Sequence, residues 1–329
     1  SGSTLLQLML HAHPRIAIPP ETRYLVDVYD RRLEFGDLRE PARRRALGLA
    51  IAKTQGTKFR DLRLDADLVI ERIVEGPPTI GSAVGITLRE YALRFDKPRW
   101  GDKRPGYWRH LGVLLSLFPD AQILHIVRDG RDCVSSLKRM PWWEHGVLAA
   151  MATWVQAVEV GRRAQHHQRP DQYHEIYYER LVSDPRTELE ALCGFLSEDF
   201  AEAMLEPSRV ASEAIPKRKS WHTRTKDTVS RAAVNQWTQQ LTPEELALME
   251  TVAGRQLRAH GYRLSGAGRA GRREVAAFWR LYARRQTVAA KWLVADRVRT
   301  LRYRRPVAAQ LTGGQLALVG STGRAPTPP

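Results

Sequence analysis

Two segments of the sequence carry groups that could bind a phosphate or a sulfate. In the first, Ser1-Gly2-Ser3-Thr4-Leu5, small and hydroxyl-bearing residues precede an apolar stretch that predicts a helix. A helix N-terminus offers an anion free backbone N–H groups and a positive dipole end. Taken alone, the segment is explained more simply as an ordinary helix cap. It also lacks the Gly-Lys-Ser/Thr sequence of a Walker A loop.

The second segment runs from Arg128 to Ser136 and follows an apolar run that predicts a buried strand. An arginine at the carboxyl end of a parallel strand points into the ligand crevice of an open α/β sheet. Ser136 lies about two helical turns later, on a similar face. A guanidinium fork and a hydroxyl together suit a phosphate monoester. A salt bridge to Asp129 or Asp132 explains Arg128 equally well.

The elements that must position these segments alternate between strand and helix. Runs 122–127 and 174–178 predict buried strands, and 98–103 resembles the end of another. This β–α order predicts an α/β fold with a largely parallel sheet and helices on both faces. The expected helices cover residues 21–32, 40–53, 88–95, 107–118, 128–140, 154–165 and 187–196.

Several motifs in one order resemble the PAPS-dependent sulfotransferases (PAPS is 3′-phosphoadenosine-5′-phosphosulfate). In motif, the sequence is most similar to the tyrosylprotein sulfotransferases and their bacterial relatives. The resemblance covers residues 1–264 and implies the P-loop-like sulfotransferase fold. The segments that carry it are Ser1–Leu6, His11–Pro14, Pro20–Arg23, Trp100–Pro105, Arg128–Ser136, Tyr177–Pro185, Gln236–Trp237, Leu241–Glu245 and His260–Tyr262.

The resemblance implies two catalytic residues. Glu21 would be the base that takes the proton from the acceptor hydroxyl, with His11 and His13 as alternative bases. Lys103 would stabilise the charge that develops on the departing phosphate. Each has a simpler structural explanation. Glu21 could serve the first turn of a helix, and Lys103 could be an exposed loop lysine.

The resemblance also implies a donor site. Arg128 and Ser136 would bind the 3′-phosphate, which distinguishes PAPS from ATP-like donors. Tyr178 would lie near the adenine, although core packing is an alternative role. The phosphosulfate would be held by Ser1, Gly2, Ser3, Thr4 and Leu5.

The implied reaction is in-line transfer of a sulfuryl group to an acceptor hydroxyl, with release of 3′,5′-ADP and no metal requirement. A peptide tyrosine, a carbohydrate and a small metabolite all remain open as acceptors. A polar stretch with Lys226, Ser230 and Arg231 could reach donor phosphate, although solvated loop is the simpler interpretation. Trp142 and Trp143 could line an acceptor pocket, although buried packing explains them more simply.

The family has a strand and a basic residue before the position of Ser1. We therefore expect the natural protein to continue upstream of this sequence. The sequence contains no secretory signal and no apolar run of the length that spans a bilayer, so we expect a cytoplasmic protein. Cys133 and Cys193 predict reduced thiols, because a domain of this size does not need a disulfide framework and their spacing fits no metal site.

Charge is concentrated near the C-terminus. The chain carries a net charge of +16, of which residues 266–329 hold +11 and residues 1–265 hold +5. Glycines around 266–271 predict a linker, so we expect a sulfotransferase domain over 1–265 and a basic tail over 266–329. Within the tail, 275–301 predicts a basic amphipathic helix and 321–329 a disordered end. The apolar stripe could dock on the domain or lie on an anionic membrane surface.

Two other classes of protein compete with the sulfotransferase hypothesis. A P-loop kinase or NTPase predicts a Walker A loop and a Mg²⁺-binding aspartate at a strand end, and neither is visible. A basic nucleic-acid-binding or membrane-binding protein predicts basic and aromatic residues mixed through the main domain. The charge lies after residue 265 instead. The pattern therefore favours an enzyme with a basic appendage, and we expect no nucleic-acid partner.

Overall fold

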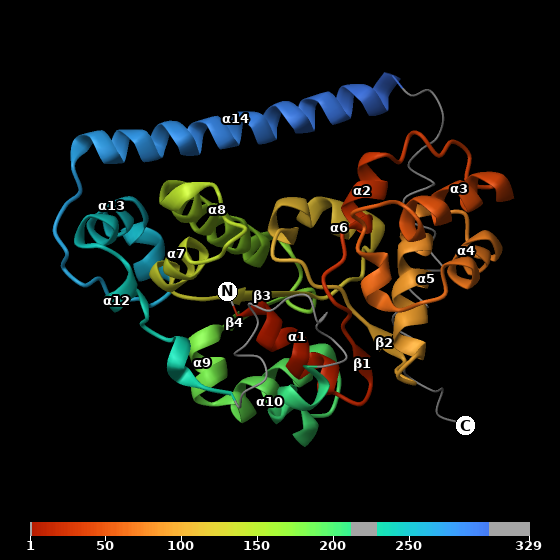
Figure 1. Cartoon of the computed structure of the whole chain (residues 1–329), viewed down its shortest axis with the longest axis horizontal. Coiled ribbons are helices and arrows are strands. Elements are labelled where there is room, and N and C mark those ends of the chain that lie inside the picture. The colour runs from red at the N-terminus through yellow and green to blue at the C-terminus, as the bar shows by residue number, and fades with distance from the viewer. Residues whose placement is uncertain (1, 212–228, 303–329) are drawn as a thin grey trace. The chain divides into compact units, whose positions relative to one another are not determined.

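The computed structural model describes residues 2–211 and 229–302 (Figure 1). The chain forms two compact units, each with a pair of parallel strands. The β1–β2 unit contains described residues 3–122, 196–211, 229 and 300–302. The β3–β4 unit contains Gly2 and residues 123–195 and 230–299. The expected combination of helices with parallel strands is therefore observed in both units.

In the β1–β2 unit, two short strands lead into the segments that carry the expected catalytic residues. Strands β1 (Ile16–Ala17) and β2 (Arg99–Trp100) pair in parallel, with Ala17 opposite Trp100. Parallel strands bring their carboxyl ends to the same edge. The helices of this unit are α1 (Ser3–Ala12), α2 (Tyr24–Asp30), α3 (Pro41–Ala52), α4 (Ala66–Glu75), α5 (Ile80–Leu93) and α6 (Leu111–Leu117), with short 3₁₀ turns η1 (Phe59–Leu62), η2 (Tyr107–His110), η3 (Glu202–Leu205) and η4 (Pro207–Val210).

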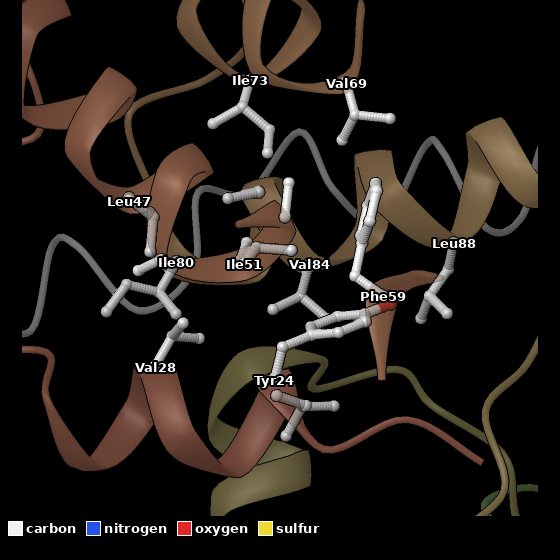
Figure 2. Close-up of a cluster of buried hydrophobic side chains, with 14 of the residues drawn as sticks. Tyr24, Val28, Leu47, Ile51, Phe59, Val69, Ile73, Ile80, Val84 and Leu88 are labelled. Atoms are coloured by element: carbon white, nitrogen blue, oxygen red, sulfur yellow. The ribbon is translucent and has the colours of Figure 1, made fainter. Parts of the chain in front are cut away.

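A buried apolar cluster holds the helices of this unit together. Figure 2 shows Tyr24 and Val28 of α2 among aliphatic side chains from α3, α4 and α5. Side-chain caps fix where two of these helices begin: Asp65 accepts from backbone N–H groups of α4, and Thr79 accepts from Ser82 of α5. The core therefore sets the position of α2, which immediately follows the Glu21 segment.

The β3–β4 unit contains the strongest strand predicted from the sequence. Strands β3 (Ile123–Val127) and β4 (Tyr173–Tyr177) pair in parallel along five residues each. Beyond β3 the chain enters α7 (Gly130–Lys138), which starts at the side-chain cap of Asp129. The other helices are α8 (Gly146–His167), α9 (Tyr178–Ser183), α10 (Pro185–Leu196), α12 (Trp237–Gln240), α13 (Pro243–Ala259) and α14 (Arg272–Arg302), with the 3₁₀ turn η6 (Arg231–Ala233).

The first half of the basic helix α14 docks on α8. Phe278 is fully buried in the core of the β3–β4 unit. The Tyr282 hydroxyl donates to Glu159 at 2.5 Å, and Arg285 donates to the carbonyl of Ala149 at 3.1 Å. The docking alternative is therefore confirmed for this half. Farther along, Val288, Leu293 and Val294 are more than half exposed. No helix in the described ranges has the length and apolar character needed to cross a bilayer.

Several expected helices differ from those observed. The helix expected over 21–32 begins only at Tyr24, and the helix expected over 88–95 is the end of the longer α5. The segment expected as helix over 107–118 starts as the 3₁₀ turn η2. The compact units divide the chain differently from the boundary predicted after residue 265, and that boundary stays a prediction. The expected disordered end, 321–329, lies outside the described residues.

Within each of two residue pairs, the two cysteines and the adjacent tryptophans, one member is more buried than the other. Both Cys133 and Cys193 are free thiols, as expected. Cys193 is buried, whereas Cys133 is only partly so.

Trp143 packs against the core and donates to the carbonyl of Gly146 at 3.0 Å. Trp142 is 53% exposed, so buried packing is wrong for this residue.

Candidate functional site

The expected donor segment leads directly into a helix. Ser1 lies outside the described residues, and α1 begins at Ser3. Ser3, Thr4 and Leu5 therefore form its first turn, at the positive end of the helix dipole. This is the loop-to-helix arrangement that the sequence predicts for an anion site.

Gly2 lies against the ring of Tyr178. Its φ of +78° is favourable for glycine, and a Cβ atom at this position would lie 2.2 Å from the Tyr178 Cδ2 atom. Tyr178 is buried at the start of α9, directly after β4. The backbone conformation and the ring therefore both require glycine here. The structure brings together two of the residues expected to bind the donor.

Arg128 extends this arrangement from the end of β3. Its guanidinium carbon lies 4.6 Å from the centroid of the Tyr178 ring, within cation–π range. The side chain is largely buried, and it donates to the carbonyl of Ala233. Its Nε has no hydrogen-bond partner within the described ranges. A buried guanidinium with an unused N–H is suited to an anionic ligand.

The salt-bridge alternative for Arg128 is present in weak form. Asp132 lies 3.5 Å from the guanidinium, but its carboxylate accepts from the backbone N–H groups of Asn235 at 2.9 Å and Trp237 at 3.0 Å. Asp129 instead pairs with Arg131 at 2.7 Å. Asp132 therefore serves mainly to attach the segment before α12 to α7.

Ser136 lies on α7 in a partly exposed position. Within the described part of the chain, no hydrogen bond joins its hydroxyl to Arg128. Of the other residues considered for donor contacts, Lys226 lies outside the described residues. Ser230 caps η6 by accepting from Ala232 at 3.0 Å, and Arg231 is exposed. Their possible contacts with phosphate stay predictions.

Glu179 is a structural residue that the sequence reasoning missed. Its carboxylate accepts from the backbone N–H of Asp129 at 2.9 Å and from the hydroxyl of Tyr262 at 3.0 Å. Burial, followed by the charge of Glu179, raises the pKa of Tyr262 well above its usual range, so this hydroxyl keeps its proton. Glu179 thereby fixes the start of α7, next to Arg128. Its signal in the sequence was the Tyr178-Glu179 pair itself.

A second polar cluster lies between β3, β4 and the end of α13. The Tyr177 hydroxyl donates to Glu175 at 2.7 Å, and His260 Nδ1 lies 3.5 Å from the same carboxylate. His125 approaches the other carboxylate oxygen at 3.7 Å. Burial acts to raise the pKa of Glu175, but interactions with His125, His260 and Tyr177 hold it well below its usual range. This carboxylate therefore stays charged.

The expected base, Glu21, lies before α2 and not in its first turn. The N-cap of α2 is Arg23, so the helix-end explanation for Glu21 is wrong. The Glu21 side chain is 22% exposed, and its Oε1 atom lies 3.4 Å from Lys58 Nζ. The carboxylate therefore keeps access to solvent, as a base that meets an acceptor must.

The two histidines considered as alternative bases are both held in structural roles. His11 is fully buried, and its Nδ1 accepts from the backbone N–H of Ile18 at 3.1 Å. Burial, with the charges of Lys97 and Arg94, lowers the pKa of His11 to about 4. His13 is also buried, with Nδ1 3.1 Å from the Arg15 nitrogen and Nε2 2.9 Å from the Asp199 carbonyl. Neither ring has the access that acceptor chemistry requires.

Lys103 follows β2 and borders an aspartate that the sequence reasoning did not single out. The backbone N–H of Lys103 donates to Asp102 Oδ1 at 2.8 Å. The same carboxylate accepts from the hydroxyl of Thr22 at 3.1 Å and from that of Tyr107. Burial raises the pKa of Asp102, while the bonds from Tyr107, Lys103 and Thr22 act against that rise. Lys103 is partly buried, so the exposed-loop explanation does not describe it.

The described residues contain no group of three or more His, Cys, Asp or Glu side chains arranged for a metal ion. The expected residues thus form two sets. Gly2, Tyr178 and Arg128 meet in the β3–β4 unit, and the Glu21 and Lys103 segments meet through Asp102 in the β1–β2 unit.

Comparison with known proteins shows the family to which this chain belongs. The profile of the sulfotransferase family matches residues 1–202, so the chain belongs to the sulfotransferase family. The sulfotransferase domain of an olefin synthase from Synechococcus PCC 7002 superposes with a TM-score of 0.57 at 25% identity, covering 80% of this chain and 92% of that one. A sulfotransferase domain from the curacin biosynthetic pathway, at 21% identity and TM-score 0.56, shares the fold. The predicted family and fold class are confirmed.

Particular relatives come from animals and bacteria. Protein-tyrosine sulfotransferase 1 of Danio rerio is 25% identical over 222 residues, covering 65% of this chain and 55% of the relative. Nodulation protein NoeE of Sinorhizobium fredii is 26% identical over 288 residues, covering 78% of this chain and 62% of the relative. The chain thus spans a little over half the length of these relatives.

Proposed function

We propose that this chain transfers a sulfuryl group from PAPS to an acceptor hydroxyl and releases 3′,5′-ADP. Membership of the sulfotransferase family supports the reaction class. The observation that carries the choice of donor is the stack of Gly2, Tyr178 and Arg128. A buried aromatic ring beside a guanidinium suits a nucleotide with a phosphate on its ribose.

Residues of the β3–β4 unit bind the nucleotide end of the donor. Arg128 presents an unused Nε–H for the 3′-phosphate, and Ser136 supplies a hydroxyl. Gly2 leaves its backbone accessible where a larger side chain would meet Tyr178. The N–H groups of Ser3, Thr4 and Leu5 bind the phosphosulfate oxygens, since the start of a helix favours anions. No metal is required, because arginine, lysine and backbone N–H groups supply the positive potential.

Glu21 removes the acceptor proton as the acceptor oxygen attacks sulfur. The bond from sulfur to the bridging phosphate oxygen breaks at the same time, and Lys103 stabilises the negative charge that develops there. The relatives do not single out one class of acceptor. A peptide tyrosine fits the name of the zebrafish relative, while a carbohydrate or a small metabolite is equally compatible with these residues.

Calorimetric titration tests the donor assignment. The protein should bind 3′,5′-ADP more tightly than 5′-AMP by about tenfold or more, because Arg128 forms a charge-assisted bond only with the 3′-phosphate. Arg128→Met should remove this preference. Arg285→Met is the matched control, since Arg285 is also a partly buried arginine of the β3–β4 unit but bonds to α8. Equal affinities for the two nucleotides in the unmodified protein would contradict the assignment.

A further inference from the structure

One carboxylate joins the segments that hold the two expected catalytic residues. Glu21 immediately precedes Thr22, whose hydroxyl donates to Asp102 Oδ2 at 3.1 Å. Lys103 immediately follows Asp102, and its backbone N–H donates to Asp102 Oδ1 at 2.8 Å. One oxygen of the carboxylate therefore holds Thr22, the neighbour of Glu21, and the other holds the backbone of Lys103 itself. Thr22 and Asp102 are 80 positions apart, so this is a tertiary connection.

The surroundings of Asp102 favour a fixed geometry. The Tyr107 hydroxyl also donates to Oδ2, and burial raises the pKa of Tyr107 well above its usual range, with the charge of Asp102 adding to the rise. Tyr107 therefore remains a hydrogen-bond donor. Thr22 is fully buried, so its hydroxyl has no competing solvent contact. With three donors on two oxygens, the carboxylate is held from both sides.

The β1–β2 strand pair, which ends just before this carboxylate, is also held by backbone hydrogen bonds. The backbone N–H of Gly101 donates to the carbonyl of Ala17 at 3.0 Å, which continues the β1–β2 pairing up to Asp102. A Cβ atom on Gly101 would lie 2.7 Å from Ile18 Cδ1, so the Ile18 side chain packs directly against Gly101. Strand pairing sets the coarse separation of the two segments, and Asp102 sets their final register.

We propose that Asp102 is a positioning residue that holds Glu21 and Lys103 at a fixed separation, through its hydrogen bonds to the Thr22 hydroxyl and to the Lys103 backbone N–H. This inference rests on the proposed function, because the two held residues act on acceptor and leaving group. Asp102 acts through these two residues and has no catalytic role of its own in the proposal. A displacement of about 1 Å in a catalytic group can lower the rate about a hundredfold, so one buried carboxylate can control turnover.

A pair of threonine variants separates positioning from stability. Thr22→Val removes the hydroxyl that reaches Asp102. Thr87→Val is the matched control, because Thr87 is also fully buried in the β1–β2 unit and donates one bond, to the carbonyl of Ala83 at 2.9 Å. We expect Thr22→Val to lower kcat about 10- to 100-fold with the KM for PAPS unchanged. Thr22→Ser should restore most of the rate, and Thr87→Val should leave kcat unchanged.

Hydrogen exchange supplies a readout that does not depend on turnover. The Lys103 amide is protected by its bond to Asp102, so its exchange should accelerate about tenfold in Thr22→Val and stay unchanged in Thr87→Val at matched global stability. Equal kcat values for the two variants, or an unchanged Lys103 exchange rate in Thr22→Val, would overturn the positioning role. Suppose instead that Lys103 exchange accelerates in Thr22→Val while the unmodified protein transfers no sulfuryl group. That result would overturn the proposed function and leave the structural link through Asp102 intact.

Discussion

The guanidinium of Arg128 lies over the ring of Tyr178, although 50 positions separate the two residues in the sequence. Each follows the last residue of a strand: Arg128 comes after β3, and Tyr178 comes after β4. Because β3 and β4 are adjacent and parallel, the two side chains meet at the carboxyl edge of the pair. This pairing explains why the Arg128 and Tyr178 motifs occur together.

Substitution of Glu21 tests the identity of the base. Glu21→Gln should lower the rate of the chemical step by about 10²–10⁴, because the amide cannot accept the acceptor proton. Affinity for 3′,5′-ADP should remain unchanged. The control is Glu71→Gln, which also removes one partner of an ion pair in the same unit, with Arg45 at 2.8 Å. Near-normal single-turnover rates in Glu21→Gln at saturating acceptor would assign the base elsewhere.

Lys103 should matter for the departing phosphate and little for folding. Lys103→Ala should slow sulfuryl transfer by about 10²–10³, since it removes charge stabilisation at the leaving oxygen. Lys53→Ala removes a surface lysine paired with Asp67 at 2.6 Å and serves as the control. Rapid-quench kinetics measure the difference. If both alanine variants transfer at the unmodified rate, Lys103 has no role in the reaction.

Because of Glu175, the stability of the β3–β4 unit should decrease at acidic pH. Because its folded-state pKa is depressed, its stabilisation is present above the unfolded value of about 4.3 and is lost as pH falls below it. Glu175→Gln should therefore lower the free energy of unfolding at neutral pH by about 1–3 kcal/mol. It should also flatten the decline in stability below about pH 5.

Urea titration at several pH values measures this effect, with Glu190→Gln as the control. Glu190 pairs with Arg186 at 3.7 Å on the surface, where ion pairs contribute little. If Glu175→Gln and the unmodified protein lose stability in parallel as pH falls, the carboxylate is not the source of the acid sensitivity.

The two halves of α14 should respond differently to substitution. Phe278→Ala should cost about 3–5 kcal/mol of stability, because its side chain is fully buried. A Trp292→Ser/Leu293→Ser double variant should leave stability nearly unchanged, since these side chains are 39% and 61% exposed. Thermal unfolding compares the two. Equal losses of stability would contradict docking by the first half alone.

The same double variant tests the membrane hypothesis without removing Phe278. If the tail binds anionic membranes, the unmodified protein should co-sediment with acidic liposomes at low salt and the double variant should not. Absence of co-sedimentation by the unmodified protein would end that hypothesis. Deletion of the whole tail is a poorer test, because it removes a core residue as well as the exposed face.

Local sequence signals were sufficient to predict those strands and helices whose own residues show a clear pattern. The apolar run at 122–127 and the following Arg128-Asp129-Gly130 correctly predicted β3 and α7, because burial and an Asp cap act within a few residues. Helix α13 was not predicted, although Thr242 and Glu245 form a capping box that marks its start. That helix could therefore have been predicted from the sequence.

Tertiary hydrogen bonds account for the late start of α2. The helix expected from Glu21 begins three residues later because Thr22 donates to Asp102 and the Arg23 N–H donates to the carbonyl of Thr57 at 3.0 Å. The Asp102 connection and the packing of Gly2 on Tyr178 likewise join distant positions. Sequence motifs could name Gly2, Tyr178 and Lys103 as candidate site residues, but periodicity and spacing contain no information about these contacts.

The most direct test of sulfuryl transfer from PAPS is a product measurement with the unmodified protein. The protein is incubated with PAPS carrying a labelled sulfuryl group and with tyrosine peptide, carbohydrate and phenolic acceptors, and both products are quantified by mass spectrometry. We predict a sulfated acceptor and 3′,5′-ADP in equal amounts. We also predict much slower transfer from adenosine 5′-phosphosulfate, which lacks the 3′-phosphate that we propose Arg128 to bind. Transfer at equal rates from both donors, or PAPS consumption that yields no sulfated acceptor, would contradict the proposal.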